Sequence, residues 1–145
     1  MTNLPITIRE FKYPDDYDAA ARLWQSMEKG VRFGRSDVPV EIEKKMKRDP
    51  ELFLVAEAEG ELVATVIGGF DGRRGMVHHL AVADAHRGHG IASQLMTELE
   101  KRLIAKGAIR AYLLVATDNT EARAFYQKRG WDCLDYNVIY AKDLA

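Results

Sequence analysis

The segment Ala85–Ser93, with the sequence AHRGHGIAS, combines two glycines, two histidines and an arginine between an apolar stretch and a run of helix-forming residues. The first turn of a helix carries backbone N–H groups without carbonyl partners, and glycine lets an anion approach that backbone closely. Arg87 adds a fork of donors suited to phosphate oxygens, and Ala92 and Ser93 keep the first turn sterically open. The segment therefore indicates a site for a phosphate or a pyrophosphate.

Glycine spacing alone does not separate such an anion site from a tight turn made by Gly88 and Gly90. A P-loop needs a Gly-Lys-Ser/Thr ending, which is absent, and this argues against nucleoside triphosphate hydrolysis. The run GHGIAS also fits a dinucleotide-binding pattern, with Asp118 as the ribose-binding acid. Against that alternative, the third small residue is a serine, and the sequence after Lys142 has no room for further βα units.

The spacing of apolar residues predicts the elements that would position this segment. Strands are expected at Ile6–Glu10, Leu52–Ala58, Leu62–Phe70, Met76–Val82, Ile109–Ala116 and, in one or two pieces, Trp131–Leu144, and helices at Pro14–Gly30, Val38–Asp49, Ile91–Lys106 and Asn119–Arg129. Asp15 or Asp16 is expected to cap the first helix, and Asp118 to start the last through a capping box with Glu121. The order β-α-α-β-β-β-α-β-α-β predicts an α/β fold with a mixed sheet and helices on its faces.

Bulk composition favours one domain, residues 1–145, because 145 residues can bury a sizeable core but divide poorly in two. The 21 basic and 22 acidic side chains give a net charge of −1, so no nucleic-acid partner is expected. No stretch approaches the roughly 20 apolar residues of a membrane span, and no membrane partner is expected. The only cysteine, Cys133, fits a reducing compartment, and we expect a cytoplasmic protein, monomeric or homodimeric.

Two motifs together resemble the GNAT superfamily of acetyl-CoA-dependent N-acetyltransferases. The family's pyrophosphate signature is Arg or Gln, two residues of any kind, Gly, one residue of any kind, and Gly or Ala, and the segment Arg87–Ala92 fits it. The run NTEARAFYQKRGW, Asn119–Trp131, resembles the family's Asn, Ala, Phe-Tyr and Gly-aromatic pattern. The resemblance covers about Met76 to Trp131, and it implies a GNAT-like acyl-CoA N-acyltransferase fold.

The resemblance also implies roles for individual residues. The strand residues Leu80, Ala81 and Val82 would pair with the pantetheine arm of the cofactor. The amides of Arg87, Gly88, His89, Gly90, Ile91 and Ala92 would wrap its pyrophosphate, and Asn119 would contact its arm. Tyr126 would lie near the thioester sulfur, where a phenol can donate a proton to the leaving thiolate. For Tyr126, core packing beside Phe125 is the alternative role.

The proton acceptor is less clear, because many GNAT enzymes place a glutamate at the position of Met76. By period-two alternation His78 shares a strand face with Met76, and serotonin N-acetyltransferase resembles this chain in having a histidine there. His78 is therefore the candidate base, with a histidine satisfied within the sheet as the alternative, and His79 is expected to face the opposite way. His86 and His89 have no evident third ligand, so no metal site is expected.

The predicted reaction is direct transfer of the acetyl group of acetyl-CoA to a primary amine of a small molecule or a peptide. A backbone N–H near Leu80 would stabilise the developing oxyanion, and Cys133 is expected to pack rather than to act as a nucleophile. Acceptor choice would be set by residues 29–45 and the final strands. Two alternatives stay open: an acyl-CoA-binding domain without catalysis, and a nicotinamide-binding oxidoreductase.

Overall fold

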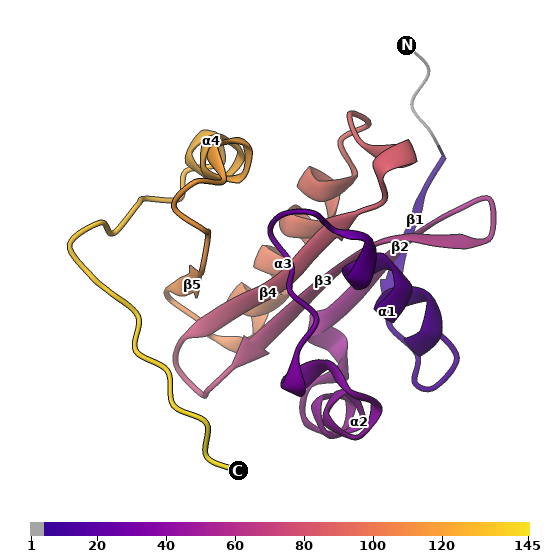
Figure 1. Ribbon diagram of the computed structural model, residues 1–145, viewed down its shortest axis with the longest axis horizontal. Coiled ribbons are helices and arrows are strands. Elements are labelled where there is room, and N and C mark those ends of the chain that lie inside the picture. Colours follow the sequence, from indigo (N-terminus) through magenta and orange to yellow (C-terminus); the bar gives the residue numbers. More distant parts are fainter. Residues whose placement is uncertain (1–4) are drawn as a thin grey trace. The chain divides into compact units, whose positions relative to one another are not determined.

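The computed structural model describes residues 5–145 and shows a mixed α/β architecture (Figure 1). The regular elements of this part of the chain are β1 (Thr7–Glu10), α1 (Tyr17–Ser26), the 3-10 helix η1 (Arg35–Asp37), α2 (Pro39–Arg48), the 3-10 helix η2 (Pro50–Leu52), β2 (Phe53–Ala58), β3 (Glu61–Phe70), β4 (Gly75–Val82), the 3-10 helix η3 (Asp84–His86), α3 (Ile91–Lys106), β5 (Ala111–Leu113) and α4 (Thr120–Lys128). The chain forms two compact units, Met1–Leu114 and Val115–Ala145. The expectation of one domain over residues 1–145 stays a prediction.

The first unit is built on a five-stranded sheet in the order β1-β2-β3-β4-β5. Strands β1 to β4 pair antiparallel with their neighbours, and β5 joins β4 in parallel. The parallel pair requires a crossover, and α3 supplies it. The predicted mixed sheet is thereby confirmed.

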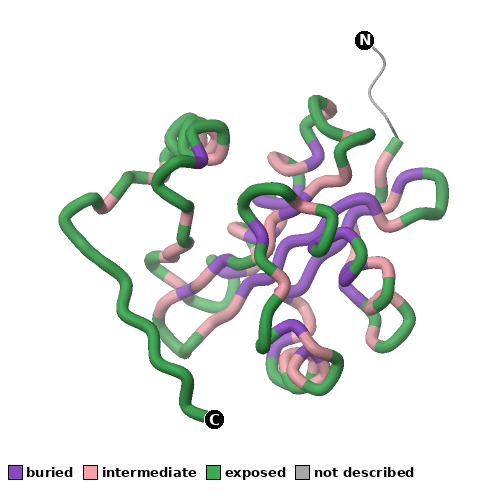
Figure 2. Tube along the Cα trace, in the orientation of Figure 1, coloured by how far each residue is buried: buried purple, intermediate pink, exposed green. Residues whose placement is uncertain are grey.

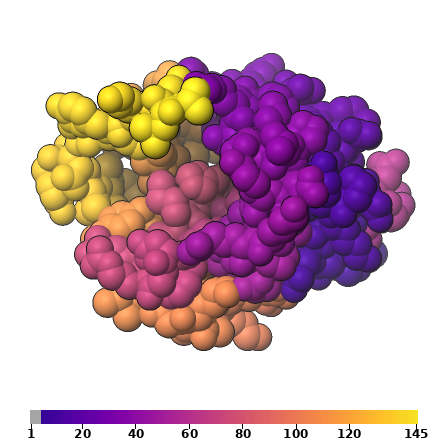
Figure 3. Space-filling model, turned by 90° about the horizontal axis from the view of Figure 1, so that it is seen from below, coloured from indigo at the N-terminus to yellow at the C-terminus, as the bar shows by residue number. Residues whose placement is uncertain are grey.

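Helices α1 and α2 lie in front of this sheet in Figure 1, and α3 lies behind it. On the α1 and α2 side, Trp24, Ile42 and Phe53 belong to one buried cluster. The central strands β2 and β3 are buried along most of their length (Figure 2). The space-filling view shows the purple α2 segment beside the indigo N-terminal residues (Figure 3). Burial of these apolar side chains supplies the main stabilisation of the unit.

Helix α3 approaches the sheet closely because two strand residues facing it are glycines. A Cβ atom on Gly68 would lie 2.5 Å from Cδ1 of Leu99, and one on Gly75 would lie 3.1 Å from Cδ2 of Leu103. The bounds of α3 are as predicted, with apolar residues buried at every fourth position, and it ends at Gly107, whose φ is 101°. This packing fixes where the N-terminus of α3 begins after β4.

Several expected elements differ from the structure. Strand β5 covers three residues rather than Ile109–Ala116, and its residues are half-buried rather than buried. The strand or strands expected over Trp131–Leu144, the last β of the predicted order, are absent from the described residues. That segment contains aromatic and β-branched side chains such as Tyr136 and Val138, but both are largely exposed. Residues with strand propensity form a strand only where a partner strand and a buried face are present. The apolar pattern of this segment does not show whether either is present, so the strand prediction is wrong.

The helix ends also differ in detail. Helix α1 ends at Ser26, before Gly30, and Asp16 precedes its first residue without capping it, because the Asp16 carboxylate is bound by Arg9. Helix α4 is capped by Asn119 rather than Asp118: the Asn119 side chain accepts a hydrogen bond from the Ala122 N–H at 3.2 Å.

Candidate functional site

The segment between β4 and α3 has the backbone conformation of an anion-binding turn. Gly88 and Gly90 have φ values of 81° and 76°, in the left-handed region that side chains other than glycine rarely adopt. A Cβ atom added at either glycine would meet no atom within 4 Å, so conformation rather than packing requires glycine there. Gly90 immediately precedes Ile91, the first residue of α3, which places open space beside the N–H groups of the first helical turn.

Arg87 lies at the start of this turn with its side chain about half exposed. Its Nε atom is 3.3 Å from Oδ1 of Asp84 and 3.4 Å from the Val82 carbonyl oxygen. The Asp84 side chain is itself 85% exposed, and an ion pair so exposed holds Arg87 only weakly. A half-exposed guanidinium, two left-handed glycines and a helix N-terminus together form a donor set that fits a pyrophosphate.

Beyond its first three residues, β4 has an edge without a partner strand. Pairing with β5 is confined to Gly75–Val77, and within the described residues His78–Val82 pair only with β3. The three residues assigned to the cofactor arm, Leu80, Ala81 and Val82, lie in this section. Their backbone is therefore placed where an extended ligand can add to the edge of the sheet.

A β-bulge interrupts β4 immediately before Ala81. Thr65 pairs with Ala81 and Ile67 pairs with His78, so two residues, His79 and Leu80, stand opposite one residue of β3. His79 has a φ of 51°. The bulge breaks period-two alternation, which is why the expectation that His79 faces away from His78 is wrong.

Both imidazoles lie on the sheet face that carries α1. His78 pairs with Ile67, a member of the apolar cluster that contains Trp24. The His79 ring packs edge-on against Trp24, with ring centroids 4.9 Å apart. His79 Nε2 lies 2.7 Å from Oδ1 of Asp37, whose side chain is only 8% exposed.

His78 itself is exposed, and its pKa is lowered, first by desolvation of the imidazole and then by the charges of His79 and Lys45. A lowered pKa favours the neutral ring near pH 7, which can accept a proton. The sequence analysis missed His79 and Asp37, because neither the bulge nor the contact between η1 and β4 leaves a pattern in the sequence.

In the second unit, Asn119 caps the N-terminus of α4 and Tyr126 lies on this helix. Asn119 is buried, and its side-chain oxygen is engaged as the helix cap. The Tyr126 ring packs edge-on against Phe125 and Trp131, at centroid distances of 5.1 Å and 5.9 Å. Burial raises the pKa of Tyr126 to about 12, against a smaller opposing effect of Arg129, so the phenol is protonated at neutral pH and keeps a proton to donate.

The other candidate groups have no such setting. Among residues 5–145, no cluster of three or more His, Cys, Asp or Glu side chains is placed to hold a metal ion. Cys133 is exposed rather than packed, contrary to expectation. No helix in the described part of the chain has the length and apolar character to cross a membrane. The antiparallel pairing of β3 with β4 also differs from the parallel sheet of a dinucleotide-binding fold, which removes the nicotinamide alternative.

Comparisons with known proteins agree with this geometry. The Acetyltransferase (GNAT) family matches residues 17–131. An acetyltransferase of Pectobacterium atrosepticum is 41% identical over 128 residues, which cover 88% of this chain and 89% of that protein.

Two solved structures are similar in fold. Ard1 from Thermoplasma volcanium has a TM-score of 0.75 at 28% identity, covering 86% of this chain and 81% of that one. PaiA N-acetyltransferase from Thermoplasma acidophilum, in complex with coenzyme A, has a TM-score of 0.76 at 19% identity and covers 87% and 89% of the two chains. The chain thus belongs to the acetyltransferase (GNAT) family and is an acyl-CoA-dependent N-acetyltransferase.

Proposed function

We propose that the chain transfers the acetyl group of acetyl-CoA directly to a primary amine. The observation that carries this proposal is the turn Arg87–Ala92, which joins two left-handed glycines to the N-terminus of α3 directly after the open section of β4. The turn would bind a diphosphate, and the open section of β4 beside it would bind an extended arm. The similar PaiA structure contains coenzyme A, which supports the same ligand class.

The proposal assigns the donor to named residues. The amides of Arg87, Gly88, His89, Gly90, Ile91 and Ala92 would hold the pyrophosphate. The backbone of Leu80, Ala81 and Val82 would bind the pantetheine arm. Asn119 would contribute through its backbone or its remaining amide donors, since its side-chain oxygen already caps α4. Acetyl-CoA would supply an activated carbonyl as a thioester.

The chemistry then needs three contributions from the protein. A backbone N–H near Leu80 would stabilise negative charge on the carbonyl oxygen. Tyr126 would give a proton to the leaving sulfur, a role supported by a pKa of about 12 that keeps the phenol protonated. An imidazole of the β4 bulge would take the proton of the amine, and His78, neutral and exposed, is the candidate that the family resemblance implies. No covalent enzyme intermediate is required.

The acceptor is proposed at the level of chemical class, as a primary amine of a small molecule or a peptide. The loop between α1 and α2 contains the exposed Arg32 and Phe33, which packs against the apolar cluster around Trp24, and these residues would help to select the acceptor. The proposal further includes a cytoplasmic location, which the single exposed Cys133 suits, and a monomeric or homodimeric state.

Isothermal titration with acetyl-CoA, free CoA and NADH tests the proposal. We expect saturable binding of acetyl-CoA and CoA and none of NADH, followed by CoA release with an amine panel of spermidine, glutamate, ethylamine and a short peptide with a free N-terminus. Absence of CoA binding would refute the assignment of the turn. Binding without turnover of any amine would support the alternative of an acyl-CoA-binding domain without catalysis.

A further inference from the structure

The bulge of β4 holds a histidine and a carboxylate in direct contact. His79 Nε2 and Asp37 Oδ1 are 2.7 Å apart, although 42 positions separate the two residues in the sequence. Their side chains are 18% and 8% exposed, so solvent screens the contact little. A carboxylate that accepts from one ring nitrogen fixes the tautomer and leaves the other nitrogen with a lone pair.

The surroundings of Asp37 suit an ionised carboxylate. Its second oxygen, Oδ2, accepts a hydrogen bond from the Gly34 N–H at 2.9 Å. Its backbone carbonyl accepts from the Tyr17 hydroxyl at 2.8 Å, which anchors η1 to α1. Oδ2 therefore has a backbone donor and Oδ1 faces the His79 ring, so both carboxylate oxygens have a partner.

The second nitrogen of His79 is available for chemistry. Within the described residues, Nδ1 has no hydrogen-bond partner, and it is not among the fully buried nitrogens that lack one. The ring is held by Trp24, and the His79 carbonyl accepts from Oγ1 of Thr65 at 2.8 Å. A left-handed conformation is uncommon for a residue other than glycine and tends to occur at functional sites. His79 also directly precedes Leu80, the residue beside which the oxyanion would be stabilised.

We propose that His79, oriented by Asp37, is the group that deprotonates the attacking amine, with Nδ1 as the accepting atom. This inference rests on the proposed acetyl transfer and assigns its base. An N–H bond of the ammonium group breaks and an Nδ1–H bond forms, while the electron pair stays on the amine nitrogen. That pair forms the C–N bond as the C–S bond breaks, and the leaving sulfur takes the proton of the Tyr126 phenol. The second proton of the acylated nitrogen then passes through water to the Tyr126 phenolate, and the imidazolium returns its proton to water.

Charged and titratable groups from three elements surround the two imidazoles. For His78, the charges of His79 and of Lys45 on α2 lower the pKa, whereas the charge of Asp37 on η1 raises it. Tyr17 on α1 stays neutral near pH 7, because burial and the charge of Asp37 raise its pKa. Of the two imidazoles, His79 is the one with a carboxylate at hydrogen-bond distance, which fixes the orientation of its ring.

The test uses His79→Asn in the full chain. Asparagine tolerates a positive φ and can still donate to Asp37, so the variant keeps the bulge and its anchor but loses the basic nitrogen. Glu59→Asn is the matched control, because Glu59 has a φ of 53° and lies exposed in the turn between β2 and β3. We expect His79→Asn to lower the turnover of ethylamine by roughly 100-fold or more, with unchanged acetyl-CoA affinity, and the control to match the wild type.

A second arm compares ethylamine with trifluoroethylamine, whose fluorines leave the amine neutral near pH 7. An amine that is already neutral needs no base to remove an ammonium proton, so the loss in His79→Asn should be much smaller for trifluoroethylamine. In Asp37→Asn the loss should likewise be larger for ethylamine than for trifluoroethylamine, since the carboxylate acts through the ring that takes the ammonium proton. Equal losses with both amines, or a larger loss in His78→Gln than in His79→Asn, would overturn the assignment.

A third arm separates this inference from the proposed function. Nitrogen-15 NMR of the imidazoles reports tautomer and titration without any acceptor. We expect the His79 ring to carry its proton on Nε2, which faces Asp37, and a lone pair on Nδ1. A His79 ring that carries its proton on Nδ1 refutes the inference even in an active enzyme. Failure to bind acetyl-CoA would refute the proposed function instead, and with it the role of His79 as a base.

Discussion

The indole Nε1 of Trp24 donates a hydrogen bond to Oγ1 of Thr65 at 2.9 Å, and the Thr65 hydroxyl in turn donates to the His79 carbonyl at 2.8 Å. Trp24 and Thr65 are both fully buried. The chain of bonds connects α1, the middle of β3 and the bulge of β4. Through these two hydrogen bonds, α1 holds the backbone of His79, whose side chain is the proposed base.

Replacing Thr65 with valine tests this connection, because valine has nearly the same shape and no hydroxyl. The Trp24 N–H would be left buried without an acceptor, and we expect a loss of about 1–3 kcal/mol in the free energy of unfolding, measured by urea denaturation. The double variant Thr65→Val with Trp24→Phe removes both partners. If the loss of unfolding free energy in the double variant equals the sum of the losses in the two single variants, the two side chains are not coupled. That result would contradict a stabilising role for the hydrogen bond.

The conformations of Gly88 and Gly90 predict a selective loss of donor binding. Gly90→Ala forces a Cβ atom onto a residue with a φ of 76°, which distorts the start of α3. We expect affinity for acetyl-CoA to fall at least tenfold by isothermal titration. Gly34→Ala is the matched control, since Gly34 has a φ of −146° and open space around it, and its affinity should stay at the wild-type value. Equal losses in both variants would argue for general instability.

Tyr126→Phe tests the proposed proton donor. The rings around Tyr126 are unchanged by loss of the hydroxyl, so acetyl-CoA affinity should stay close to wild type while kcat falls roughly 100-fold. Equal losses of kcat and affinity would indicate a packing role.

The pKa of about 12 gives a separate expectation for stability. In the unfolded chain a tyrosine ionises near pH 10, so between about pH 10 and 12 the folded state holds more protons than the unfolded state. Below about pH 10, Tyr126 makes its full contribution to the free energy of unfolding, and this contribution is lost as the pH rises from about 10 to 12. The decline in unfolding free energy over that window should therefore be weaker in Tyr126→Phe.

Much of the fold was predictable from local pattern. Helix α3 has apolar residues at every fourth position and a glycine at its end, and both its bounds and its glycine cap follow from these signals alone. The turn Arg87–Ala92 was predictable for the same reason, since its chemistry is contiguous in the sequence. Asn119 and Tyr126 were placed on a helix by their motif, but their contacts depend on tertiary packing.

The contact between His79, the proposed base, and Asp37 was not predictable from the sequence. His78 and His79 are equivalent in the sequence, and strict alternation assigns them opposite faces. The bulge reverses that result, and Asp37 reaches His79 only because η1 packs beside α1 through the Tyr17 hydroxyl. Pairing register and long-range contacts are set by the whole sheet rather than by local sequence. For the same reason, local propensity predicts strands over Trp131–Leu144 that the structure lacks.

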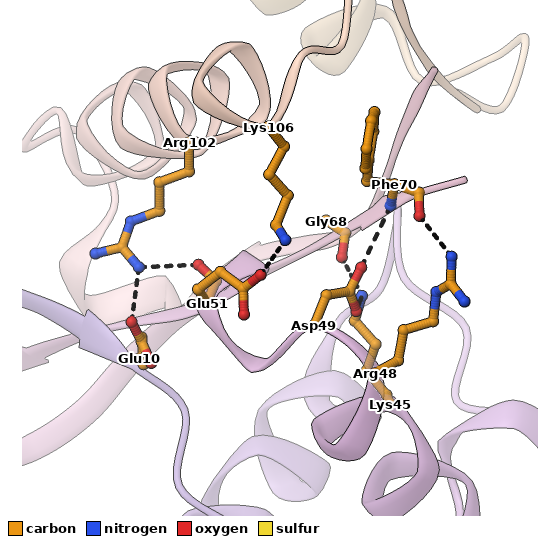
Figure 4. A network of polar contacts seen from close by, with 9 residues as sticks. All are labelled: Glu10, Lys45, Arg48, Asp49, Glu51, Gly68, Phe70, Arg102 and Lys106. Atoms are coloured by element: carbon orange, nitrogen blue, oxygen red, sulfur yellow. Dashed lines mark hydrogen bonds and ion pairs between the residues drawn. The ribbon is translucent and has the colours of Figure 1, made fainter. Parts of the chain in front are cut away.

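A polar network between the C-terminal end of α2 and β3 supports the scaffold (Figure 4). The buried Asp49 carboxylate pairs with Lys45 and accepts from the Phe70 N–H at 3.3 Å, while Lys45 also donates to the Gly68 carbonyl. Arg48 donates to the Phe70 carbonyl at 2.9 Å. The C-terminal end of α2 is thereby fixed to the end of β3, on which the register of β4 depends.

Removing the charge of Asp49 should weaken this attachment. Asp49→Asn leaves Lys45 without a counter-ion, and because the Lys45 side chain is 19% exposed we expect a loss of about 2 kcal/mol, less than the roughly 3–5 kcal/mol of a fully buried pair. The comparison is Glu43→Gln, which breaks an exposed pair with Lys47 on the same helix and should cost no more than about 0.5 kcal/mol. Urea denaturation of both variants measures the difference, and similar losses would mean that burial adds nothing to the Asp49 pair. Because the network lies on elements that position β4 rather than on the turn Arg87–Ala92, acetyl-CoA affinity of folded Asp49→Asn should stay near the wild-type value.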